Sequence, residues 1–342
     1  MDKKSVLVTG GAGYIGSHTV VELFSAGFEP IIVDDFRNSD IRVIKRLQDL
    51  VGQNIPYYSI DVCDYSKFKS IAEEHKIEGI IHFAAYKAVG ESVQDPLKYY
   101  ANNVQGVVNV LQLMLNYDIK HLIFSSSCTV YGIPSNGTQV VENDDTTKAN
   151  SPYGTTKVIG EQILVDVAKS NPSLRILSLR YFNPIGAHPS AQIGELPIGK
   201  PNNLVPFITQ TAAGKYPSLT VHGDDYPTSD GTCVRDYIHV VDLAKAHVMG
   251  LEHLVGKQEE TLDFINVGTG QGLSVLEMIR TFVEVSGVQL NYAIGPRRPG
   301  DVAEIYANAE KVDSVLGWKP IYSAADAVLH AWNWEKVYMN EK

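Results

Sequence analysis

Tyr153 and Lys157 are four residues apart in the segment 151–157, which reads Ser-Pro-Tyr-Gly-Thr-Thr-Lys. On a helix this spacing places both side chains on one face. A free tyrosine has a pKa of about 10, and a lysine ammonium beside it favours the phenolate. Pro152 suits the first turn of a helix, so we expect the pair where a helix leaves a loop. The pair is a candidate acid–base site, but many surface helices carry the same spacing by chance, so its surroundings must decide.

Composition limits the classes of protein to consider. The chain has 342 residues, 44% hydrophobic and 20% charged, as in a globular protein of two domains or one large one. Its net charge of −10 argues against nucleic acid or an anionic membrane as the main partner. The three cysteines lie far apart, without metal or disulfide spacing, which favours a reducing cytoplasm. Residues 1–4 run directly into a strand-like segment, so we expect no signal peptide and no membrane span.

A glycine-rich loop separates a predicted strand (residues 5–9) from a predicted helix (residues 18–26). Within this loop Gly10, Gly13 and Gly16 are spaced as in dinucleotide-binding fingerprints. Such a loop turns tightly, lets the backbone approach a pyrophosphate and directs a helix N-terminus at its charge. The alternative is a glycine-rich turn without a ligand.

An acidic residue follows the second predicted strand, residues 30–33. Asp34 comes 21 residues after Gly13, close to the distance expected for the acid that binds an adenosine ribose. Asp35 follows it, so a 2′-phosphate would meet two carboxylates, which favours NAD over NADP. Arg37 is near enough to keep NADP open.

Further strands and helices follow in alternation. Asp61 ends the third strand, where it either accepts a hydrogen bond from an adenine or caps the helix predicted over residues 65–75. His82 lies in an apolar run and is expected to be a core histidine. Residues 96–117 form a long apolar stripe at helical spacing, expected in the core or at a subunit interface. The additional predicted strands are 55–60, 79–83, 121–124 and 174–179.

A run of hydroxyl residues, Ser125–Gly132, leaves the end of the fifth predicted strand. Ligands of open parallel sheets bind at the carboxyl ends of strands, so these hydroxyls can bind a substrate oxygen. Serine-rich loops are also common without function. The run contains no G-x-S-x-G elbow, which argues against an acyl-enzyme nucleophile.

The regular alternation of strands and helices ends after Asn183. Up to that point it predicts a doubly wound parallel sheet with helices on both faces, a Rossmann fold. We expect residues 1–183 to form this domain and residues 184–342 mainly a smaller α/β substrate domain. We also expect the chain to cross back near residues 234–250 and 303–309. Within the smaller domain, strands are expected at 219–222 and 264–267.

Three arginines of the second part are candidate ligands of a phosphate group. Arg235 lies in an apolar setting, and Arg297 and Arg298 lie near a turn. Arginine forks bind phosphates well, and two from separate segments can hold a pyrophosphate between them. For Arg297 an exposed or salt-bridged role is the better interpretation. For Arg235 and Arg298 both interpretations stay open.

These motifs together resemble one family. In order and spacing the chain is similar to the UDP-glucose 4-epimerases, of the extended short-chain dehydrogenase/reductase superfamily, over roughly residues 5 to 320. The glycine loop and Tyr153-x-x-x-Lys157 indicate only the superfamily, whereas the stretch 87–92 and the arginine segments are specific to the epimerases. The matching segments are 10–16, 87–92, 125–132, 153–157, 180–183, 201–204, 234–237 and 297–301.

The resemblance implies a reaction in which one bound NAD is not consumed. Tyr153 would remove the proton of the sugar 4-hydroxyl while C4 gives a hydride to the nicotinamide. The resulting 4-keto sugar turns, and the hydride returns to its opposite face. Ser127 would bind the 4-oxygen with support from Thr129, and Lys157 would hold the nicotinamide ribose and lower the pKa of Tyr153.

The resemblance also assigns ligand contacts. It implies NAD, UDP-glucose and UDP-galactose as ligands, and a homodimer formed through the helices 96–117 and 152–170. Besides Ser127, Tyr153 and Lys157, the matched cofactor contacts are Gly10, Gly13, Tyr14, Ile15, Gly16, Asp34, Asp61, Val62, Phe83, Ala84, Lys87, Asn102 and Phe182. Besides Ser127 and Tyr153, the matched substrate contacts are Asn183, Asn203, Leu204, Arg235, Tyr237, Arg298 and Asp301.

Two departures and two alternatives accompany this resemblance. Cys128 stands where alanine is common, and Ile305 stands where family members carry either a bulky aromatic residue or a small one. A bulky aromatic residue there resembles enzymes confined to UDP-glucose and UDP-galactose, and a small one resembles enzymes that also accept N-acetylated sugars. Because isoleucine is intermediate in size, we expect weak activity on UDP-N-acetylglucosamine. A sugar-nucleotide 4,6-dehydratase would need Asp-Glu after Thr129, where this chain has Val130-Tyr131. An NAD-sensing regulator would be expected to lack the tyrosine base.

Overall fold

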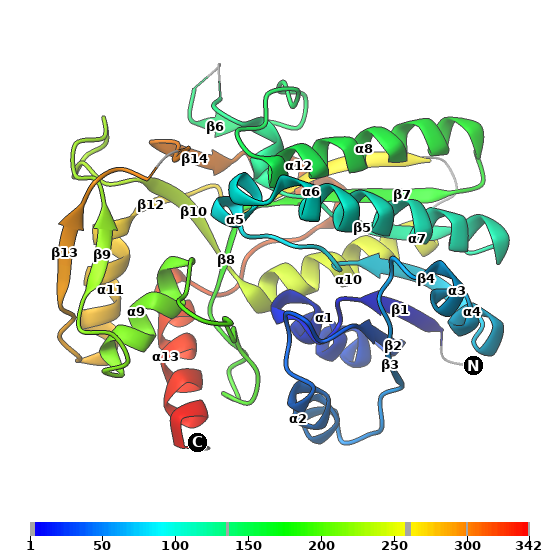
Figure 1. Ribbon diagram of the computed structural model, residues 1–342, viewed down its shortest axis with the longest axis horizontal. Helices are drawn as coiled ribbons and strands as arrows, with labels where there is room; N and C mark the ends of the chain where they lie inside the picture. Colours follow the sequence, from blue (N-terminus) through cyan, green and yellow to red (C-terminus); the bar gives the residue numbers. More distant parts are fainter. Residues whose placement is uncertain (1–3, 135–136, 257–260, 299, 341–342) are drawn as a thin grey trace.

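A seven-stranded sheet forms the larger part of the molecule. In this computed structural model, residues 4–134, 137–256, 261–298 and 300–340 are described. Within them the sheet has the order β11-β7-β5-β4-β1-β2-β3, and all neighbouring strands are parallel (Figure 1). Its strands are β1 (Ser5–Thr9), β2 (Glu29–Asp34), β3 (Tyr57–Ser59), β4 (Ile77–His82), β5 (His121–Ser125), β7 (Arg175–Tyr181) and β11 (Leu262–Val267).

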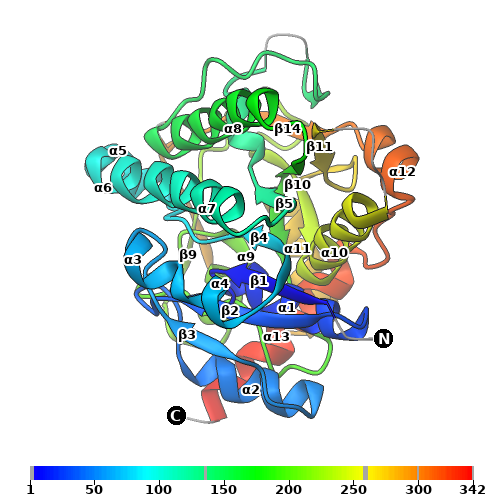
Figure 2. The ribbon, with the colours of Figure 1, turned by 90° about the vertical axis from the view of Figure 1, so that its right-hand side faces the viewer.

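Helices cover both faces of this sheet (Figure 2). The pleat of β1 shows why, because Val6 and Val8 join one hydrophobic core while Leu7 joins the other. The first core contains side chains of α1 (Tyr14–Ser25), α2 (Arg42–Val51), α10 (Val240–Gly256) and α12 (Glu310–Leu316). The second contains side chains of α3 (Tyr65–Phe68), α4 (Ser70–Glu74), α7 (Gln105–Asn116) and α8 (Pro152–Ser170). The prediction of a doubly wound parallel sheet is confirmed.

A second, smaller unit lies beyond the carboxyl ends of these strands (Figure 1). The chain passes from β7 to β8 at Phe182, and β8 pairs with β10 instead of with the large sheet. The strands of this unit are β6 (Gln139–Val140), β8 (Asn183–Ile185), β9 (Leu219–His222), β10 (Val234–His239), β12 (Gly272–Ser274), β13 (Tyr292–Gly295) and β14 (Glu304–Ala307). Its helices are α9 (Leu204–Ala212), α11 (Val275–Ser286) and α13 (Ala324–Asn340).

Two predicted elements differ from the structure. The strand expected over residues 264–267 in the smaller domain is part of β11, which pairs with β7 at the edge of the large sheet. The preceding α10 lies against β5 and β7 and so delivers the chain to that edge. The single helix expected over residues 96–117 consists of α6 (Pro96–Tyr99), a π-helical turn (Tyr100–Val104) and α7. The domain boundary near Asn183 stays a prediction.

Candidate active site

The glycine loop forms a cradle that only glycine permits at two of its positions. Gly10 has a φ of +69°, and a Cβ on it would lie 2.8 Å from the backbone nitrogen of Ala84. A Cβ on Gly16 would overlap the carbonyl oxygen of Gly10, so α1 packs directly on the loop. In this part of the described chain, no side chain caps the N-terminus of α1 and its first turn carries no acid. Its backbone N–H groups are therefore suited to a phosphate, and the cradle fits the pyrophosphate of NAD.

Asp34 connects the end of β2 to this loop. One carboxylate oxygen accepts a hydrogen bond from the backbone N–H of Ala12 at 3.1 Å. The other accepts from the N–H of Phe36 at 2.9 Å and the hydroxyl of Ser39 at 2.7 Å. Burial raises the pKa of Asp34, and these three hydrogen bonds oppose the rise. The carboxylate thereby stands where β2 and the glycine loop meet, the position expected for an acid that binds a ribose.

Arg37 bridges Asp35 and Asp61, with nitrogen–oxygen distances of 2.5 and 2.6 Å. This pairing raises its pKa. Asp61 also accepts a hydrogen bond from the backbone N–H of Cys63 at 2.8 Å. The helix-cap interpretation of Asp61 is wrong, because the side chain of Asp64 caps α3.

Tyr153 and Lys157 lie in the first two turns of α8, as predicted. The helix begins with Pro152, and the hydroxyl of Ser151 caps it by accepting a hydrogen bond from the N–H of Gly154 at 3.1 Å. Both side chains are buried, at 7% and 5% exposure. The Lys157 ammonium donates to the carbonyl oxygen of Ser125 at 2.6 Å and lies 5.9 Å from the centre of the Tyr153 ring.

Burial is the largest influence on the pKa values of both residues of this pair. Burial lowers the pKa of Lys157 to about 8, with Glu161 opposing the change. Burial also raises the pKa of Tyr153 well above its ordinary value, Tyr181 adds to the rise, and a hydrogen bond with Ser127 opposes it. The expectation that Lys157, together with a cofactor cation, lowers the pKa of Tyr153 stays a prediction. The Lys157 ammonium is held in place by the carbonyl oxygen of Ser125.

The run of hydroxyl residues Ser125–Gly132, which we call the serine run, lies next to Tyr153 and Lys157. The Ser127 hydroxyl accepts a hydrogen bond from the backbone N–H of Thr129 at 3.2 Å. Within the described residues, the Thr129 hydroxyl is buried without a hydrogen-bond partner. Ser125 and Tyr181 share a hydrogen bond of 2.6 Å between their hydroxyls. The run therefore presents the Ser127 hydroxyl to Tyr153, at the carboxyl end of β5.

A buried ion pair behind the serine run was not assigned a role from the sequence. Arg180 donates to both carboxylate oxygens of Glu161, at 2.9 and 2.8 Å. Glu161 also accepts from the hydroxyls of Ser126 at 2.7 Å and Ser178 at 3.1 Å, and Arg180 donates to the Tyr131 hydroxyl at 3.1 Å. We call these five residues the ion-pair cluster. The sequence did contain a sign of Glu161's place near the site, because Glu161 is four residues after Lys157 and helical spacing puts the two on one face.

The predicted phosphate-binding arginines share one carboxylate. Arg298 donates to Asp301 at 3.1 and 3.2 Å, and Arg235 lies 3.7 Å from the same carboxylate. We call these three residues the arginine cluster. Arg297 instead pairs with Asp225 at 2.6 Å, which confirms its salt-bridged interpretation. Pro299, between these segments, lies outside the described residues.

The arginine cluster lies within electrostatic reach of the serine run. Burial raises the pKa of the Cys128 thiol to about 12, and the charge of Arg235 opposes that rise. Phe182 and Ile305 share a hydrophobic cluster with Val130 and Tyr131 of the serine run. The fold therefore brings together residues from both parts of the chain at the carboxyl ends of the strands.

Other predicted contacts lie around this centre. Asn183 is in β8, in register with Tyr237 of β10. Asn203 precedes Leu204, the first residue of α9. The Tyr14 hydroxyl donates to the carbonyl oxygen of Gly186 at 2.7 Å. The remaining predicted cofactor contacts lie beside the large sheet: Ile15 against the first core, Val62 and Ala84 in or against the second, Phe83 against the ring of His247, and Asn102 in the π-helical turn.

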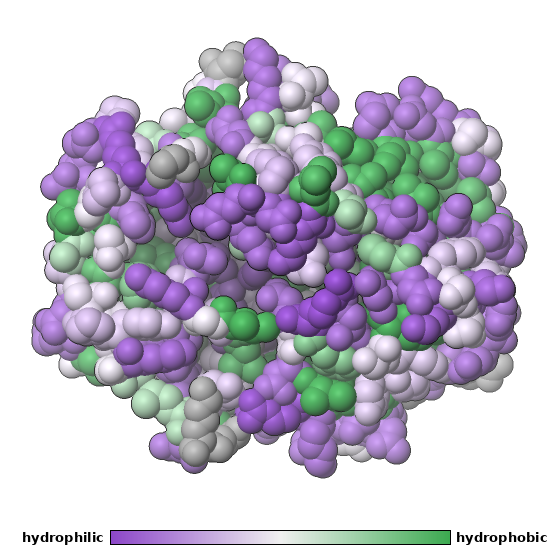
Figure 3. Space-filling model, in the orientation of Figure 1, coloured by the Kyte–Doolittle hydropathy of each residue, from purple (hydrophilic) through white to green (hydrophobic). Residues whose placement is uncertain are grey.

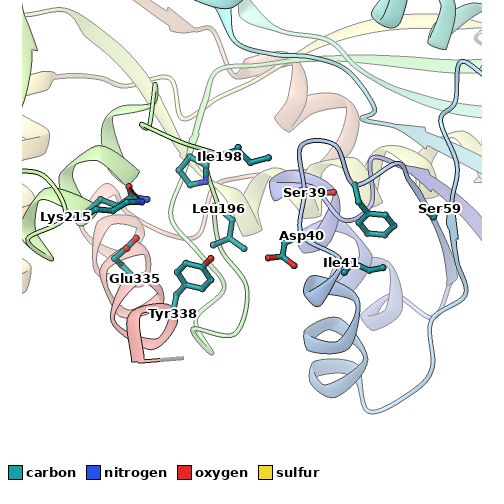
Figure 4. Close-up of a pocket in the computed structure, with 12 residues that line it drawn as sticks. Ser39, Asp40, Ile41, Ser59, Leu196, Ile198, Lys215, Glu335 and Tyr338 are labelled. Carbon is teal, nitrogen blue, oxygen red and sulfur yellow. Dashed lines mark hydrogen bonds between the residues drawn. The ribbon is translucent and has the colours of Figure 1, made fainter. Parts of the chain in front are cut away.

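A cavity of about 520 Å³ opens next to Ser39 (Figure 4). The Ser39 hydroxyl is hydrogen-bonded to Asp34, so the cavity lies close to that acid. Ser39, Asp40 and Ile41 line it from the β2–α2 connection, and Leu196 and Tyr338 face them from the smaller unit (Figure 4). The two units therefore face each other across the adenosine end of the expected dinucleotide site.

Among all residues that the structure describes, no helix combines the length and apolar character needed to cross a membrane.

Comparison with known proteins assigns the family. The family described as GDP-mannose 4,6 dehydratase matches residues 7–330. The UDP-glucose 4-epimerase of Bacillus subtilis is 46% identical over 336 residues, which cover 98% of each chain.

Two solved structures are similar along the whole chain. A UDP-glucose 4-epimerase from Stenotrophomonas maltophila with bound NAD and formylated UDP-arabinopyranose has a TM-score of 0.95 at 45% identity. It covers 99% of this chain and 100% of its own. The enzyme from Bifidobacterium longum in complex with NAD+ and UDP has a TM-score of 0.95 at 44% identity, with the same coverage. The chain belongs to the UDP-glucose 4-epimerase family.

Proposed function

We propose that this protein interconverts UDP-galactose and UDP-glucose by epimerisation at C4, using a bound NAD. The observation that carries the proposal is the convergence of Ser127, Tyr153 and Lys157 at the carboxyl ends of the strands, the same edge of the parallel sheet from which the glycine loop leaves β1. NAD fits the cradle and supplies the oxidising and reducing capacity at C4 when it is bound. The same reaction gives the arginine cluster a role, because a UDP-sugar carries a pyrophosphate.

The residues of this chain handle the proton of the sugar 4-hydroxyl. Tyr153 accepts it, and Ser127, hydrogen-bonded to Tyr153, holds the 4-oxygen and passes the proton between them. Because burial raises the pKa of Tyr153, proton removal requires positive charge near the phenol. Lys157 supplies one such charge, fixed by the Ser125 carbonyl, and the nicotinamide of a bound NAD⁺ would supply another.

The arginine cluster is proposed to hold the substrate by its pyrophosphate. Arg298 is half-exposed and Arg235 is mostly buried, so their forks can bind one pyrophosphate from two sides. Contacts to the nucleotide from Asn183, Asn203, Leu204 and Tyr237 complete the proposed site. Strong binding of the nucleotide with weak binding of the sugar leaves the sugar free to present either face to Tyr153.

An assay without added nicotinamide tests this function. Purified protein is mixed with UDP-galactose, and UDP-glucose and NADH are followed over time. We expect product to rise to a constant ratio with no free NADH, because the bound NAD is regenerated in each cycle. Formation of NADH from added NAD⁺ without epimer would indicate an ordinary dehydrogenase. Binding of NAD and UDP without any turnover would indicate a regulator.

We also propose a cytoplasmic homodimer. Large hydrophobic side chains are exposed at Val93 (62%) of α5 (Val89–Gln94), at Leu97 (78%) of α6 and at Leu115 (45%) of α7. Hydrophobic residues gather over α7 and α8 on the surface (Figure 3). Such a patch suits an isologous helical interface between two copies. The three free cysteines support a reducing compartment, and sedimentation equilibrium measures the assembly.

A further inference from the structure

Glu195 joins two segments that were predicted separately, one for the cofactor and one for the substrate. Its carboxylate oxygen Oε1 lies 3.1 Å from the Lys87 ammonium and 2.7 Å from the side-chain nitrogen of Asn203, which both donate to it. The Glu195 side chain is only 11% exposed, whereas that of Lys87 is 47% exposed. One shielded carboxylate therefore holds two residues that come from different units of the fold.

The backbone around Glu195 is held firmly. Its carbonyl oxygen accepts a hydrogen bond from the indole N–H of Trp334 at 3.2 Å. A Cβ on Gly194 would overlap the Trp334 ring, so this segment lies directly against α13. The next residue, Leu196, lines the cavity between the two units (Figure 4). The carboxylate consequently stands in a fixed position between the units.

The partners of Glu195 lie beside both expected ligands. The Lys87 ammonium is 5.8 Å from the centre of the Tyr14 ring, and Tyr14 is the first residue of α1, which starts at the glycine cradle. Asn203 precedes α9 on the substrate side. Because its side-chain nitrogen donates to Glu195, the amide oxygen of Asn203 points away and is able to accept from a ligand.

Resting on the proposed function, we propose that Glu195 is a positioning residue that couples the dinucleotide and UDP-sugar sites. Binding at either site orders one partner of Glu195, and the shared carboxylate then orders the other, so that each ligand favours retention of the other. The coupling is reciprocal, and it requires the carboxylate itself as well as both partners.

The release rate of bound NAD, with and without saturating UDP, tests this coupling without any turnover. We expect UDP to slow release about tenfold in the wild type and by less than about twofold in Glu195→Ala, because couplings between sites are typically 5- to 150-fold. Lys87→Met should lose the UDP effect too, and the double variant should lose no more than the single ones. Glu195→Gln keeps an oxygen for Asn203 but loses the charge for Lys87, so its ratio should be intermediate.

Glu284→Gln, on α11, is the matched control for loss of a carboxylate and should keep the wild-type ratio. A UDP effect that persists in both Glu195 variants would overturn the proposal, even if their thermal stability fell. An absent UDP effect in the wild type would overturn it as well. Because these are binding measurements, loss of coupling in an active epimerase and absence of epimerase activity are separate results.

Discussion

The ion-pair cluster and the arginine cluster both combine arginine with carboxylate, yet they differ in burial and in number of partners. Arg180 and Glu161 are 5% and 6% exposed, and their partners include groups of the large sheet and of the serine run. Arg298 is 52% exposed and pairs with an Asp301 that is 16% exposed. One cluster is closed to solvent, and the other is reached by solvent at Arg298.

This difference follows what each end of the site must do. Proton and hydride transfer depend on atomic positions held within about half an ångström, so the loop carrying Ser127 needs rigid support. Ser126 and Tyr131, on either side of Ser127, are hydrogen-bonded to Glu161 and Arg180 respectively. A nucleotide that must enter and leave needs a cation that solvent reaches, and the shared Asp301 carboxylate holds the two arginines together while no ligand is bound. The comparison makes distinct predictions for the two ends.

The largest effect is expected at the reacting oxygen itself. Tyr153→Phe removes the hydroxyl that accepts the sugar proton, and general bases contribute about 10²- to 10⁴-fold to rate. We expect kcat to fall by about 10³-fold while the affinity for UDP stays unchanged. Steady-state kinetics together with calorimetry of UDP binding measure both quantities.

The matched control for this variant is Tyr181→Phe. It removes a buried hydroxyl that is hydrogen-bonded to Ser125 and has no proposed role in transferring the sugar proton. A single hydrogen bond of this kind is worth about 1 kcal/mol, so kcat should fall less than tenfold. Turnover that survives in Tyr153→Phe would require a different base and would end the proposed mechanism.

Stability separates the two clusters next. Glu161→Gln leaves Arg180 buried without its charge partner, which typically costs about 3–5 kcal/mol. Asp301→Asn alters a cluster in which Arg298 is half-exposed and Arg235 lies 3.7 Å from the carboxylate, so we expect a cost of only about 1 kcal/mol. We expect the midpoint of thermal unfolding to fall by at least about 5 °C in the first variant and by about 2 °C or less in the second. Equal midpoints would mean that the ion-pair cluster gives no special support to the serine run.

Substrate affinity gives a third and smaller contrast. Arg298→Ala removes charged hydrogen bonds to a pyrophosphate, each worth about 1.5–3 kcal/mol, so UDP should bind about 10- to 100-fold more weakly. Arg297→Ala removes the neighbouring arginine, whose partner Asp225 is 70% exposed. We expect affinity within about twofold of the wild type for this variant. If both variants weakened UDP equally, a general charge effect would replace the proposed contact.

Much of the large sheet was predictable because its signals are local. Residues 5–34 alone contain a buried strand, a glycine loop, a helix and an acid, and the structure has each of them in that order. Tyr153 and Lys157 were found for the same reason, since helical spacing brings them together. For Arg297 an exposed or salt-bridged role was expected, and it forms a salt bridge with Asp225.

The remainder depends on contacts that spacing does not reveal. Glu195 and Lys87 are 108 residues apart, and no pattern in the sequence pairs them. The strand predicted over residues 264–267 was assigned to the smaller unit because only its position along the chain was visible, whereas the path of α10 was not. Burial, the largest influence on the pKa of Tyr153, also depends on the complete fold and has no local signal in the sequence.

The smallest effect concerns the choice of sugar, at the border of the two clusters. Ile305 is 6% exposed, is in register with Arg235 on β10, and belongs to the hydrophobic cluster of Phe182. Ile305→Ala should enlarge the space next to the substrate. We expect the ratio of kcat/KM for UDP-N-acetylglucosamine to that for UDP-glucose to rise about tenfold, because removing methyl groups from an apolar pocket changes discrimination by about that much.

Ile279→Ala is the control for packing, because Ile279 is 3% exposed on α11 in a different hydrophobic core. Both variants create a cavity and should lose stability by similar amounts. Only Ile305→Ala should change the ratio, since only Ile305 lies beside the proposed substrate contacts. Equal ratios in the wild type and in Ile305→Ala would exclude Ile305 as the residue that limits the sugar. The residue that limits which sugar is accepted would then have to lie on the buried side of the site, where the serine run and Tyr153 are proposed to face the sugar.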